Sequence, residues 1–400
     1  MFGGNWNRTK RPASQSLNSN RNLLFFSPAA RGGLADYARE QANALAAAGL
    51  QVTLLGSPGF KARSGDRYVF SPKLAQRPGT APARSRIASR LGTVRYILKN
   101  AQALERSVSQ SGCRHILIGA FAEYLAPLWA GPLRRLARRG AVFGAVVHDP
   151  VRGLVVGPQL WHQWSVAAAY SFLREAFVHE PIQLDTVRAR PGLRITVIPH
   201  GTYRFEPGRK TPGVVRQQLS IPPHAPVLLS FGLVRDRKNL DLTVRALKQL
   251  PEWFLVVAGQ EERNGQKPIA YYQGLAETEG VAGRCRWLAG FIPESEVGDL
   301  FGVADLVPVT YERGFRSASG VLNVAVGYRR PCVASSGPSN LQSVVNQYKL
   351  GVWVEPDSVE ALVQGVRRWR KEPPAPEWER YEAEHSWTRN AQLVIERMFE

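Results

Sequence analysis

The sequence predicts an α/β protein with two parallel, doubly wound sheets, one in each half of the chain. Near the amino end, a short apolar run, a Gly-Gly turn, a helical stretch and a second apolar run follow one another, which is the order of a βαβ unit. These segments occupy residues 22–27, 29–33, 34–48 and 51–55. A second series of the same kind follows the linker-like stretch 206–213. Its first strand, helix and second strand occupy residues 227–231, 240–250 and 253–258.

Further strand-like runs extend both sheets, at 115–119, 141–147, 176–178 and 195–198 in the first half and at 286–288, 305–309 and 332–335 in the second. We therefore expect Rossmann-like domains at 21–205 and 206–380. A disordered tail at 1–20 precedes them, and a helix at 381–400, able to cross back to the first domain, follows. The basic, Pro- and Gly-bearing stretch 61–90 is expected to be a mobile loop.

The charge of the chain is large and unevenly distributed. The formal net charge is +20; residues 1–200 hold 27 Lys and Arg against 9 Asp and Glu, whereas residues 201–400 hold 25 against 23. Such a basic first half predicts an anionic partner, which a membrane surface, an acidic polymer or nucleic acid would provide. Three widely spaced cysteines argue against a disulfide framework or a zinc site and favour a reducing compartment. Residues 153–173 are uncharged but too often interrupted for a membrane-spanning helix.

The stretch 304–336 contains the strongest indication of a binding site. A predicted strand at 305–309 leads through a polar loop into a helix at 321–328, so the loop lies at the carboxyl end of a strand and the amino end of a helix. Anionic ligands bind at such places because free N–H groups and the helix dipole face them. Ser317, Ser319 and Gly320 suit a close approach of phosphate, although an ordinary strand–loop–helix connection has the same composition.

The order of residues in this stretch resembles a known family. Tyr311, several polar residues, Ser319-Gly320-Val321 and an Ala-bearing helix before Pro331 resemble the sugar-nucleotide site of the family-four glycosyltransferases of the GT-B fold. The resemblance spans about residues 21–390. It implies two Rossmann-like domains facing a central cleft, with the nucleotide-sugar donor in the second and the acceptor in the first. It also implies retaining transfer without a metal or other cofactor, and the sequence contains no Asp-x-Asp metal motif.

The loop Phe231–Lys238, FGLVRDRK, carries two cations three residues apart, Arg235 and Lys238. Such cations are commonly just solvated, and we expect both on an exposed loop. In the resembled family this pattern binds the donor diphosphate, where an Arg and a Lys neutralise charge on the leaving group. The family usually has Gly after this Lys, and this chain has Asn239.

Two positions in the first half resemble the family's site. Gly32-Gly33 lies between a predicted strand and helix, and is either a tight turn or the glycine loop that faces the donor phosphates without a Cβ. His148 ends a central strand and is either a structural histidine or the family's residue beside the transferred sugar. His200-Gly201 resembles the signature near the hinge and is expected to shape the cleft.

The resemblance is incomplete for the acidic residues. Many members carry two Glu separated by seven residues; counting from Glu312 puts the second at Gly320, and counting back from Pro331 puts the pair at Arg316 and Val324. Glu312 stays a catalytic candidate, although the pair is broken. Phe291 and Ile292 match a loop whose backbone faces the nucleobase.

We expect a glycosyltransferase that transfers a hexose from a UDP- or GDP-linked donor, with retention, to a lipid-linked or polysaccharide acceptor. The expected catalytic residues are His148, Arg235, Lys238 and Glu312, and the donor-binding residues are Gly32, Gly33, Phe291, Ile292, Ser319, Gly320 and Val321. The alternatives are an inactive GT-B binding partner or, with no recognisable motif for it, a nucleic-acid-binding protein. The absence of a signal-peptide core suggests a cytoplasmic enzyme, held at an anionic membrane face by basic residues such as Arg134, Arg135, Arg138 and Arg139.

Overall fold

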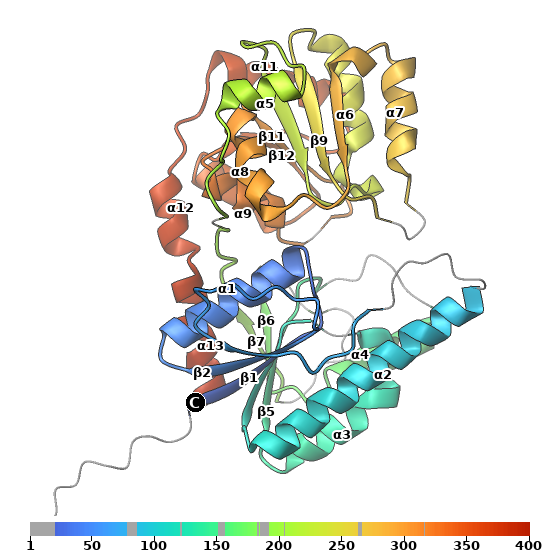
Figure 1. Cartoon of the computed structure of the whole chain (residues 1–400), viewed down its shortest axis with the longest axis vertical. Coiled ribbons are helices and arrows are strands. Elements are labelled where there is room, and N and C mark those ends of the chain that lie inside the picture. Colours follow the sequence, from blue (N-terminus) through green and yellow to red (C-terminus); the bar gives the residue numbers. More distant parts are fainter. Residues whose placement is uncertain are drawn as a thin grey trace, which may run out of the picture.

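The computed structural model describes residues 21–77, 86–120, 122–150, 157–181, 184, 192–203, 205–262, 266–315 and 317–400. Two α/β domains lie one above the other, and the last part of the chain runs along both of them (Figure 1). The expected tail at 1–20 lies outside the described residues. No helix in the described part of the chain is both long enough and apolar enough to span a bilayer.

The first domain has a seven-stranded parallel sheet in the order β3-β2-β1-β4-β5-β6-β7. Its strands are β1 (Asn22–Ser27), β2 (Gln51–Gly56), β3 (Val69–Ser71), β4 (His115–Ile118), β5 (Val142–Val146), β6 (Glu175–Val178) and β7 (Arg194–Val197). The connecting helices are α1 (Gly33–Ala47), α2 (Arg86–Ser111), α3 (Ala126–Arg138) and α4 (Gln159–Ala169), with a 3₁₀ turn η1 (Glu123–Leu125) before α3. Each crossover thus covers one face of the sheet, as expected for a doubly wound domain.

Alternation along β1 shows how both faces of this sheet are buried. Leu23 and Phe25 pack in one cluster with residues of α1, whereas Leu24 and Phe26 pack in another with residues of α2, α3 and α4. Successive side chains of a strand point to opposite faces, so an apolar run without polar alternation requires cover on both. The apolar run at 22–27 is therefore the sequence signature of this central strand.

The second domain has the strand order β10-β9-β8-β11-β12-β13, because β8 and β11 meet through a parallel bridge between Leu228 and Leu306. Its strands are β8 (Val227–Phe231), β9 (Phe254–Gly259), β10 (Cys285–Ala289), β11 (Val307–Thr310), β12 (Cys332–Ser335) and β13 (Gly351–Trp353). Its helices are α5 (Pro212–Gln218), α6 (Leu240–Ala246), α7 (Ile269–Thr278), α8 (Glu294–Val303), α9 (Gly320–Gly327), α10 (Asn340–Gln347) and α11 (Val359–Lys371), with 3₁₀ turns η2 (Asp236–Lys238), η3 (Leu247–Gln249) and η4 (Ala282–Arg284). The chain order reverses at β8 and β11, where α/β domains bind ligands.

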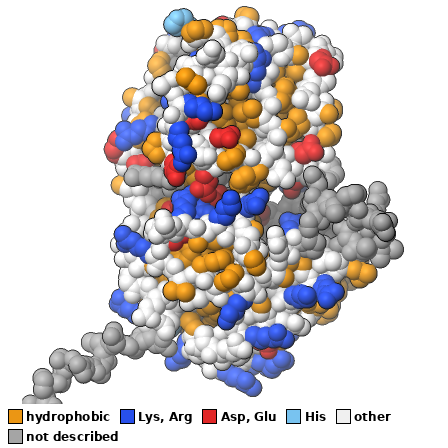
Figure 2. Space-filling view, in the orientation of Figure 1, with side chains coloured by type: hydrophobic (Ala, Val, Ile, Leu, Met, Phe, Trp, Pro, Cys, Tyr) orange, Lys and Arg blue, Asp and Glu red, His pale blue; other side chains and the backbone are white. Residues whose placement is uncertain are grey.

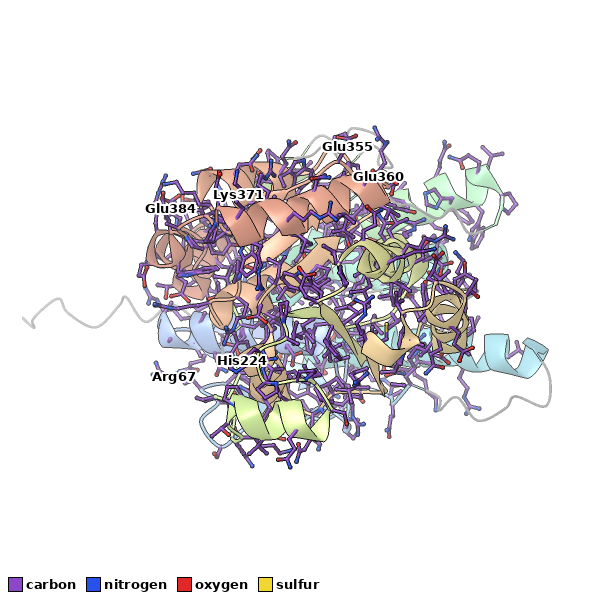
Figure 3. The ribbon with its side chains drawn as sticks, turned by 90° about the horizontal axis from the view of Figure 1, so that it is seen from above. Arg67, His224, Glu355, Glu360, Lys371 and Glu384 are labelled. Carbon is purple, nitrogen blue, oxygen red and sulfur yellow. The ribbon has the colours of Figure 1, made fainter. Side chains whose placement is uncertain are left out.

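Two carboxyl-terminal helices follow, α12 (Trp378–Glu384) and α13 (Trp387–Phe399). Tyr381 of α12 is buried in the core of the second domain, whereas Ala391, Val394 and Met398 of α13 are buried with α1 in the first. The chain therefore crosses between the domains twice, once near 200–206 and once near 385 (Figure 1). Helix α11 carries exposed charged side chains, such as Glu360 and Lys371, on the outer surface of the second domain (Figure 3).

The stretch 61–90 is not a loop throughout, which corrects that expectation. Residues 69–71 form β3 and pair with β2, and Tyr68 and Leu74 are buried. Residues 86–90 begin α2, while 78–85 lie outside the described part. The burial of these few apolar side chains outweighs the basic, loop-like composition around them. The three cysteines, Cys113, Cys285 and Cys332, are buried free thiols.

Candidate active site between the two domains

The candidate residues of the second domain come from the carboxyl ends of β8, β10 and β11. Arg235 and Lys238 follow β8, Tyr311 and Glu312 follow β11, and Phe291 follows β10. Neighbouring strands are about 4.8 Å apart, so these ends form one edge of the sheet. Hydrogen bonds join two of the loops: Thr310 Oγ1 donates to Lys238 O over 3.0 Å, and Glu312 N donates to Arg237 O over 3.2 Å.

Arg235 and Lys238 are half-buried, so the expectation of an exposed loop is wrong for both. The Nε of Arg235 is buried and has no hydrogen-bond partner in the described chain. Lys238 Nζ donates to Phe231 O over 3.0 Å, which leaves two of its three N–H donors for another group. Burial, and secondarily the Arg235 charge, lower the pKa of Lys238 to about 7. Unpaired buried donors of this kind require an acceptor, and an anion supplies one.

Asn239 explains how this chain departs from the resembled pattern. Its backbone is left-handed, with φ 51° and ψ 36°, at the junction of η2 and α6. Glycine adopts this conformation freely, and asparagine tolerates it better than most other residues. The Asn239 side chain also donates to Asp357 Oδ1 over 3.0 Å, which fixes the loop against the turn before α11. The substitution therefore keeps the backbone geometry that a glycine would give.

The amino end of α9 converges on the same place. Ser319 caps the helix by accepting from Leu322 N, and its hydroxyl lies 2.7 Å from the buried Tyr311 hydroxyl. Gly232 is the meeting point: a Cβ built on it would lie 3.3 Å from Lys238 Nζ and 3.8 Å from Val321 Cγ2. Nothing lies within 4 Å of a Cβ position on Gly320, and Gly320 does not have a positive φ. Open space therefore adjoins the first turn of α9, where helix amides favour an anion.

Glu312 is engaged by its own domain. Its carboxylate lies 3.2 Å from Arg237 Nε, with 38% of the side chain exposed. Counting back from Pro331 puts the two Glu positions at 316 and 324. Residue 316 lies outside the described part, and Val324 is buried in the core. The structure thus offers Glu312 as a single carboxylate on this edge rather than as half of a pair.

The first domain contributes Gly32 and Gly33 at the start of α1. Gly32 has φ 78°, a conformation that disfavours a side chain, and both positions are open on the Cβ side. Tyr203 connects this turn with α9: its hydroxyl lies 3.5 Å from Gly33 O, and its N–H donates to Asn323 O over 3.3 Å. Nothing in the sequence around Tyr203 indicated this bridging position.

His148 and Asp149 also face the second domain. Ser317 Oγ, in the loop before α9, donates to Asp149 Oδ1 over 2.7 Å. His148 Nε2 lies 3.1 Å from the Gly119 carbonyl, so this nitrogen carries the proton and Nδ1 is an acceptor. Burial lowers the pKa of His148 to about 4, despite the opposing effect of Asp149. The imidazole is neutral near pH 7, which suits hydrogen bonding better than proton transfer.

Three histidines that end neighbouring strands surround Tyr37. His148, His179 and His200 lie beyond β5, β6 and β7, with ring centroids 4.7, 5.2 and 5.2 Å from that of Tyr37. Burial also lowers the pKa of His200 to about 4. A Cβ on Gly201 would overlap the Trp387 ring, so a glycine here lets Trp387 pack against the chain where it crosses between the domains. In the described residues, no group of three or more His, Cys, Asp or Glu is placed to hold a metal ion.

Phe291 and Ile292 follow β10, next to an ion-pair network between the domains. Phe291 is 51% exposed, and Ile292 packs at the margin of the core. Glu294, at the start of α8, lies 3.0 Å from Nη1 of Arg39 and also pairs with Arg63, both from the first domain. Charged side chains of both signs gather at the level where the domains meet (Figure 2).

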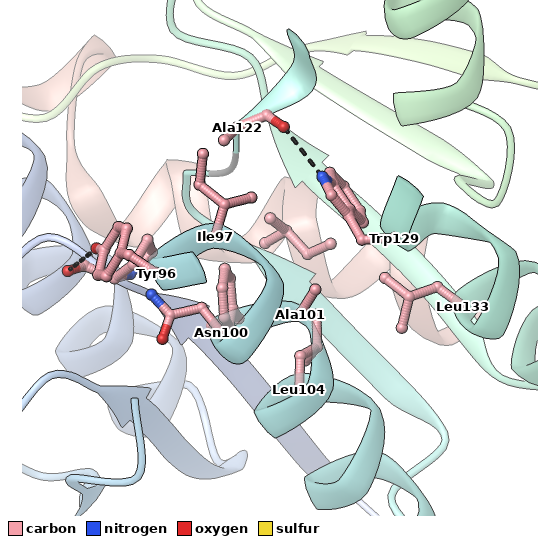
Figure 4. Close-up of a pocket in the computed structure, with 11 residues that line it drawn as sticks. Tyr96, Ile97, Asn100, Ala101, Leu104, Ala122, Trp129 and Leu133 are labelled. Atoms are coloured by element: carbon pink, nitrogen blue, oxygen red, sulfur yellow. Dashed lines mark hydrogen bonds between the residues drawn. The ribbon is translucent and has the colours of Figure 1, made fainter. Parts of the chain in front are cut away.

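An apolar cavity of about 50 Å³ lies on the first domain beside the ends of β1 and β4 (Figure 4). Pro28, Ile97 and Trp129 are among its lining residues, from β1's following turn, α2 and α3. Two of its polar groups are satisfied, since Trp129 Nε1 donates to Ala122 O over 3.2 Å and Tyr96 Oη lies 3.4 Å from Pro28 O, whereas Asn100 Nδ2 is buried without a partner in the described chain. The cavity therefore suits a small apolar group and offers little to a charged one.

Two Rossmann-like domains, with unpaired cationic donors and an open helix terminus between them, define a protein of the GT-B class. Residues 214–394 match the family model described as glycosyl transferases group 1. The second domain is therefore similar to this family, and the chain as a whole has the GT-B fold.

Solved structures of known proteins share this fold along nearly the whole chain. Sucrose-phosphate synthase from Thermosynechococcus elongatus has a TM-score of 0.66 and 19% identity, over 94% of this chain and 97% of that one. An Anabaena protein, HepE, in complex with UDP-glucose has a TM-score of 0.63 and 14% identity, over 94% and 95%. WaaG, a glycosyltransferase involved in lipopolysaccharide biosynthesis, has a TM-score of 0.57 and 16% identity, over 94% and 95%. No curated protein matches the sequence.

Proposed function

We propose that the protein transfers a hexose from a UDP- or GDP-linked donor, with retention of configuration. The observation that carries this proposal is the approach of Lys238 and the first turn of α9 to Gly232, with the unpaired Nε of Arg235 on the same loop and its charge acting on Lys238. Two cations and a helix amino terminus are suited to a diphosphate. The HepE complex with UDP-glucose, which has the same fold, supports a nucleotide sugar as the donor.

In the proposed reaction the protein stabilises the leaving nucleoside diphosphate. Arg235 and Lys238 would bind its phosphates, with the amides of Ser319, Gly320 and Val321 facing them and Gly32-Gly33 closing the site from the first domain. The Gly290–Ile292 backbone would face the nucleobase. His148 and Glu312 would hydrogen-bond the sugar on either side. No metal or other cofactor is needed for this arrangement, because protein cations and amides provide the positive charge.

The acids of the site bear on the route by which a retaining transfer would proceed. A retaining glycosidase uses two carboxylates about 5 Å apart, one of them as nucleophile. Here Glu312 pairs with Arg237 and lacks the second Glu of the family's pair. We therefore propose same-face attack by the acceptor hydroxyl, whose proton passes to the departing phosphate while the sugar–phosphate bond breaks.

For the acceptor we propose a lipid-linked or polysaccharide saccharide, bound against the first domain. The apolar cavity beside β1 and β4 supports an acceptor with an apolar group, and the WaaG likeness agrees with a role in surface-saccharide synthesis. The proposed location is the cytoplasmic face of an anionic membrane. Leu160 and Trp164 on α4, 80% and 57% exposed, would add interfacial contact to the basic residues of α3.

A panel of UDP- and GDP-sugars tests the donor proposal. Nucleoside diphosphate release, followed by mass spectrometry with a mixture of saccharide acceptors, should occur with one donor class. NMR of the product should show the anomeric configuration of the donor. A product of inverted configuration would contradict retention. If no donor in the panel released a nucleoside diphosphate, the proposal that the protein is an enzyme would be contradicted.

The second candidate function is a GT-B protein that binds a nucleotide sugar without turnover. The specific observation in its favour is the broken Glu pair, with Glu312 held by Arg237. Donor binding in calorimetry, with no nucleotide release under any acceptor condition, would distinguish it from the enzyme.

A further inference from the structure

A second cationic cavity lies at the opposite edge of the first domain, and the proposed transfer reaction does not use it. Its volume is about 460 Å³, within the usual range for small-molecule sites. Residues that line it include Arg134 and Arg138 of α3, Val142 at the start of β5, and Arg174 just before β6. Because the strands are parallel, these amino ends lie about 15 Å from the edge that carries His148.

Three arginines line this cavity, and its described lining contains no acidic residue. A fourth is close by, because Arg114 Nη2 lies 3.5 Å from the Cβ position of the lining residue Gly140. Lys and Arg side chains gather at this lower end of the molecule (Figure 2). Like charges around one cavity repel each other unless an anion neutralises them.

Most of these side chains are not occupied by other structural roles. Arg134 and Arg138 have no hydrogen-bond or ion-pair partner in the described chain. Helix α3 does not need them as caps, because the amides of Arg139, Gly140 and Ala141 already bond its last carbonyls. Arg174 Nη2 donates to the Arg397 and Met398 carbonyls in the last turn of α13, whereas its Nε is buried and unpaired.

The electrostatics of Arg174 agree with an electropositive site. Burial, followed by the neighbouring Arg194 charge, lowers the pKa of Arg174, and these effects outweigh the opposing carboxylates of Glu175 and Glu400. Glu175 is already paired with Arg194 Nε over 2.9 Å. The apolar part of the lining, from Phe172 and Leu173, would contact the body of an organic ligand.

We propose that this cavity, formed by Arg134, Arg138 and Arg174 at the amino ends of β5 and β6, binds a phosphoryl group outside the transfer site. Arginine forks match phosphate oxygens in pairs, and the four-residue spacing puts Arg134 and Arg138 on one face of α3. The phosphoryl group comes either from a free phosphorylated compound or from an anionic lipid headgroup. Either ligand would act at a distance from the reacting sugar, by holding α3 against β5 and β6.

The same helix provides a matched control. Arg135 and Arg139 are exposed, as Arg138 is, but they are not among the lining residues, and they also lie four residues apart. The variant Arg134→Gln/Arg138→Gln and the control Arg135→Gln/Arg139→Gln remove the same charge from the same helix. A diffuse basic surface would respond equally to both changes, whereas a cavity would respond to the first.

The experiment measures how inorganic pyrophosphate protects individual arginines of the whole protein from phenylglyoxal, with peptide mass spectrometry as the readout. We expect protection of Arg134, Arg138 and Arg174 but not of Arg135 and Arg139. The half-maximal pyrophosphate concentration for Arg174 should rise at least ten-fold in the Arg134→Gln/Arg138→Gln variant and less than three-fold in the control. Because the readout is site-resolved, pyrophosphate bound near Arg235 does not interfere, and failure of the transferase proposal leaves this result unaffected.

A second arm replaces pyrophosphate with vesicles of phosphatidic acid or of phosphatidylcholine. Protection by pyrophosphate would show that the cavity binds a free phosphorylated compound. Protection by phosphatidic acid vesicles alone would show that it binds a lipid headgroup. Equal protection of all four α3 arginines by either probe, or protection of none by both, would overturn the proposed cavity site.

Discussion

At the scale of single residues, Lys238 connects burial with ligand charge. Its pKa is about 7 because burial disfavours the ammonium form, with Arg235 adding to this effect. Lys238 is therefore protonated below pH 7 and largely neutral above pH 8. A bound diphosphate favours the charged form and raises this pKa.

We accordingly predict that UDP or GDP, whichever binds, takes up close to one proton on binding at pH 8 and much less at pH 6. Calorimetry in two buffers of different ionisation enthalpy measures this number. Lys238→Arg should abolish the proton uptake, since a guanidinium stays charged. Equal uptake in this variant and in the wild type would place the titration on another group.

Asn239 provides a test of local backbone strain. Asn239→Ala puts a Cβ into a left-handed conformation and also removes the bond to Asp357, which together should lower the free energy of unfolding by about 2–3 kcal/mol. Asn239→Gly loses the hydrogen bond but not the conformation, and should cost about 1 kcal/mol. Urea denaturation measures both values. If the two variants were equally stable, the backbone conformation would carry no part of the asparagine's role.

The residue scale also shows what sequence could and could not predict. Arg235, Lys238 and Ser319 were identifiable because each occupies a short pattern between a strand and a helix. The partial burial of Arg235 and Lys238 could not be predicted, because it depends on the loop after β11 folding over η2. The roles of Tyr203 and Arg39 could not be predicted from sequence, because both depend on contacts between segments far apart in the chain. Asn239 departs from the glycine usual in the resembled family, but its φ of 51° shows that it adopts a backbone conformation that glycine favours.

At the scale of elements, the central strands of both sheets could be read from apolar runs because both of their faces are buried. The three-residue strands β3 and β13 lie at sheet edges and carry too few apolar residues to stand out. Helix α2 spans 26 residues, but its first turns fall in a basic stretch that resembles a loop. Edge strands and long surface helices depend on packing against neighbours, which composition does not record.

The role of the first turn of α9 in nucleotide binding can be tested by substitution. Gly320→Val should leave the circular dichroism spectrum unchanged, because the Cβ position is open and φ is not positive. It should abolish nucleotide binding in calorimetry, because the added methyl groups occupy the space in front of the helix amides. Gly274→Val, on helix α7 and also open at its Cβ position, is the control and should bind normally. Undiminished binding by Gly320→Val would remove α9 from the site.

At the scale of the whole molecule, the network of Arg39, Arg63 and Glu294 holds the domains together. Arg39 is 4% exposed, so a lost partner would leave a buried charge poorly paired. Glu294→Gln should therefore favour a more open arrangement of the domains, with a larger radius of gyration in X-ray scattering and a raised KM for the donor. Glu296→Gln, two residues further along α8 and exposed, should change neither quantity. Identical scattering from the wild type and Glu294→Gln would show that other contacts hold the domains.

The most direct test of the account is hydrogen exchange with and without a bound nucleotide sugar, because it reports on both domains at once. We predict slower exchange in three segments: 232–240 after β8, 311–323 into α9, and 31–36 at the start of α1. The Arg235→Ala variant should lose this protection and turn over about a hundred-fold more slowly. Protection confined to other segments, or undiminished in Arg235→Ala, would contradict a donor site built from β8, α9 and the first domain's glycine turn.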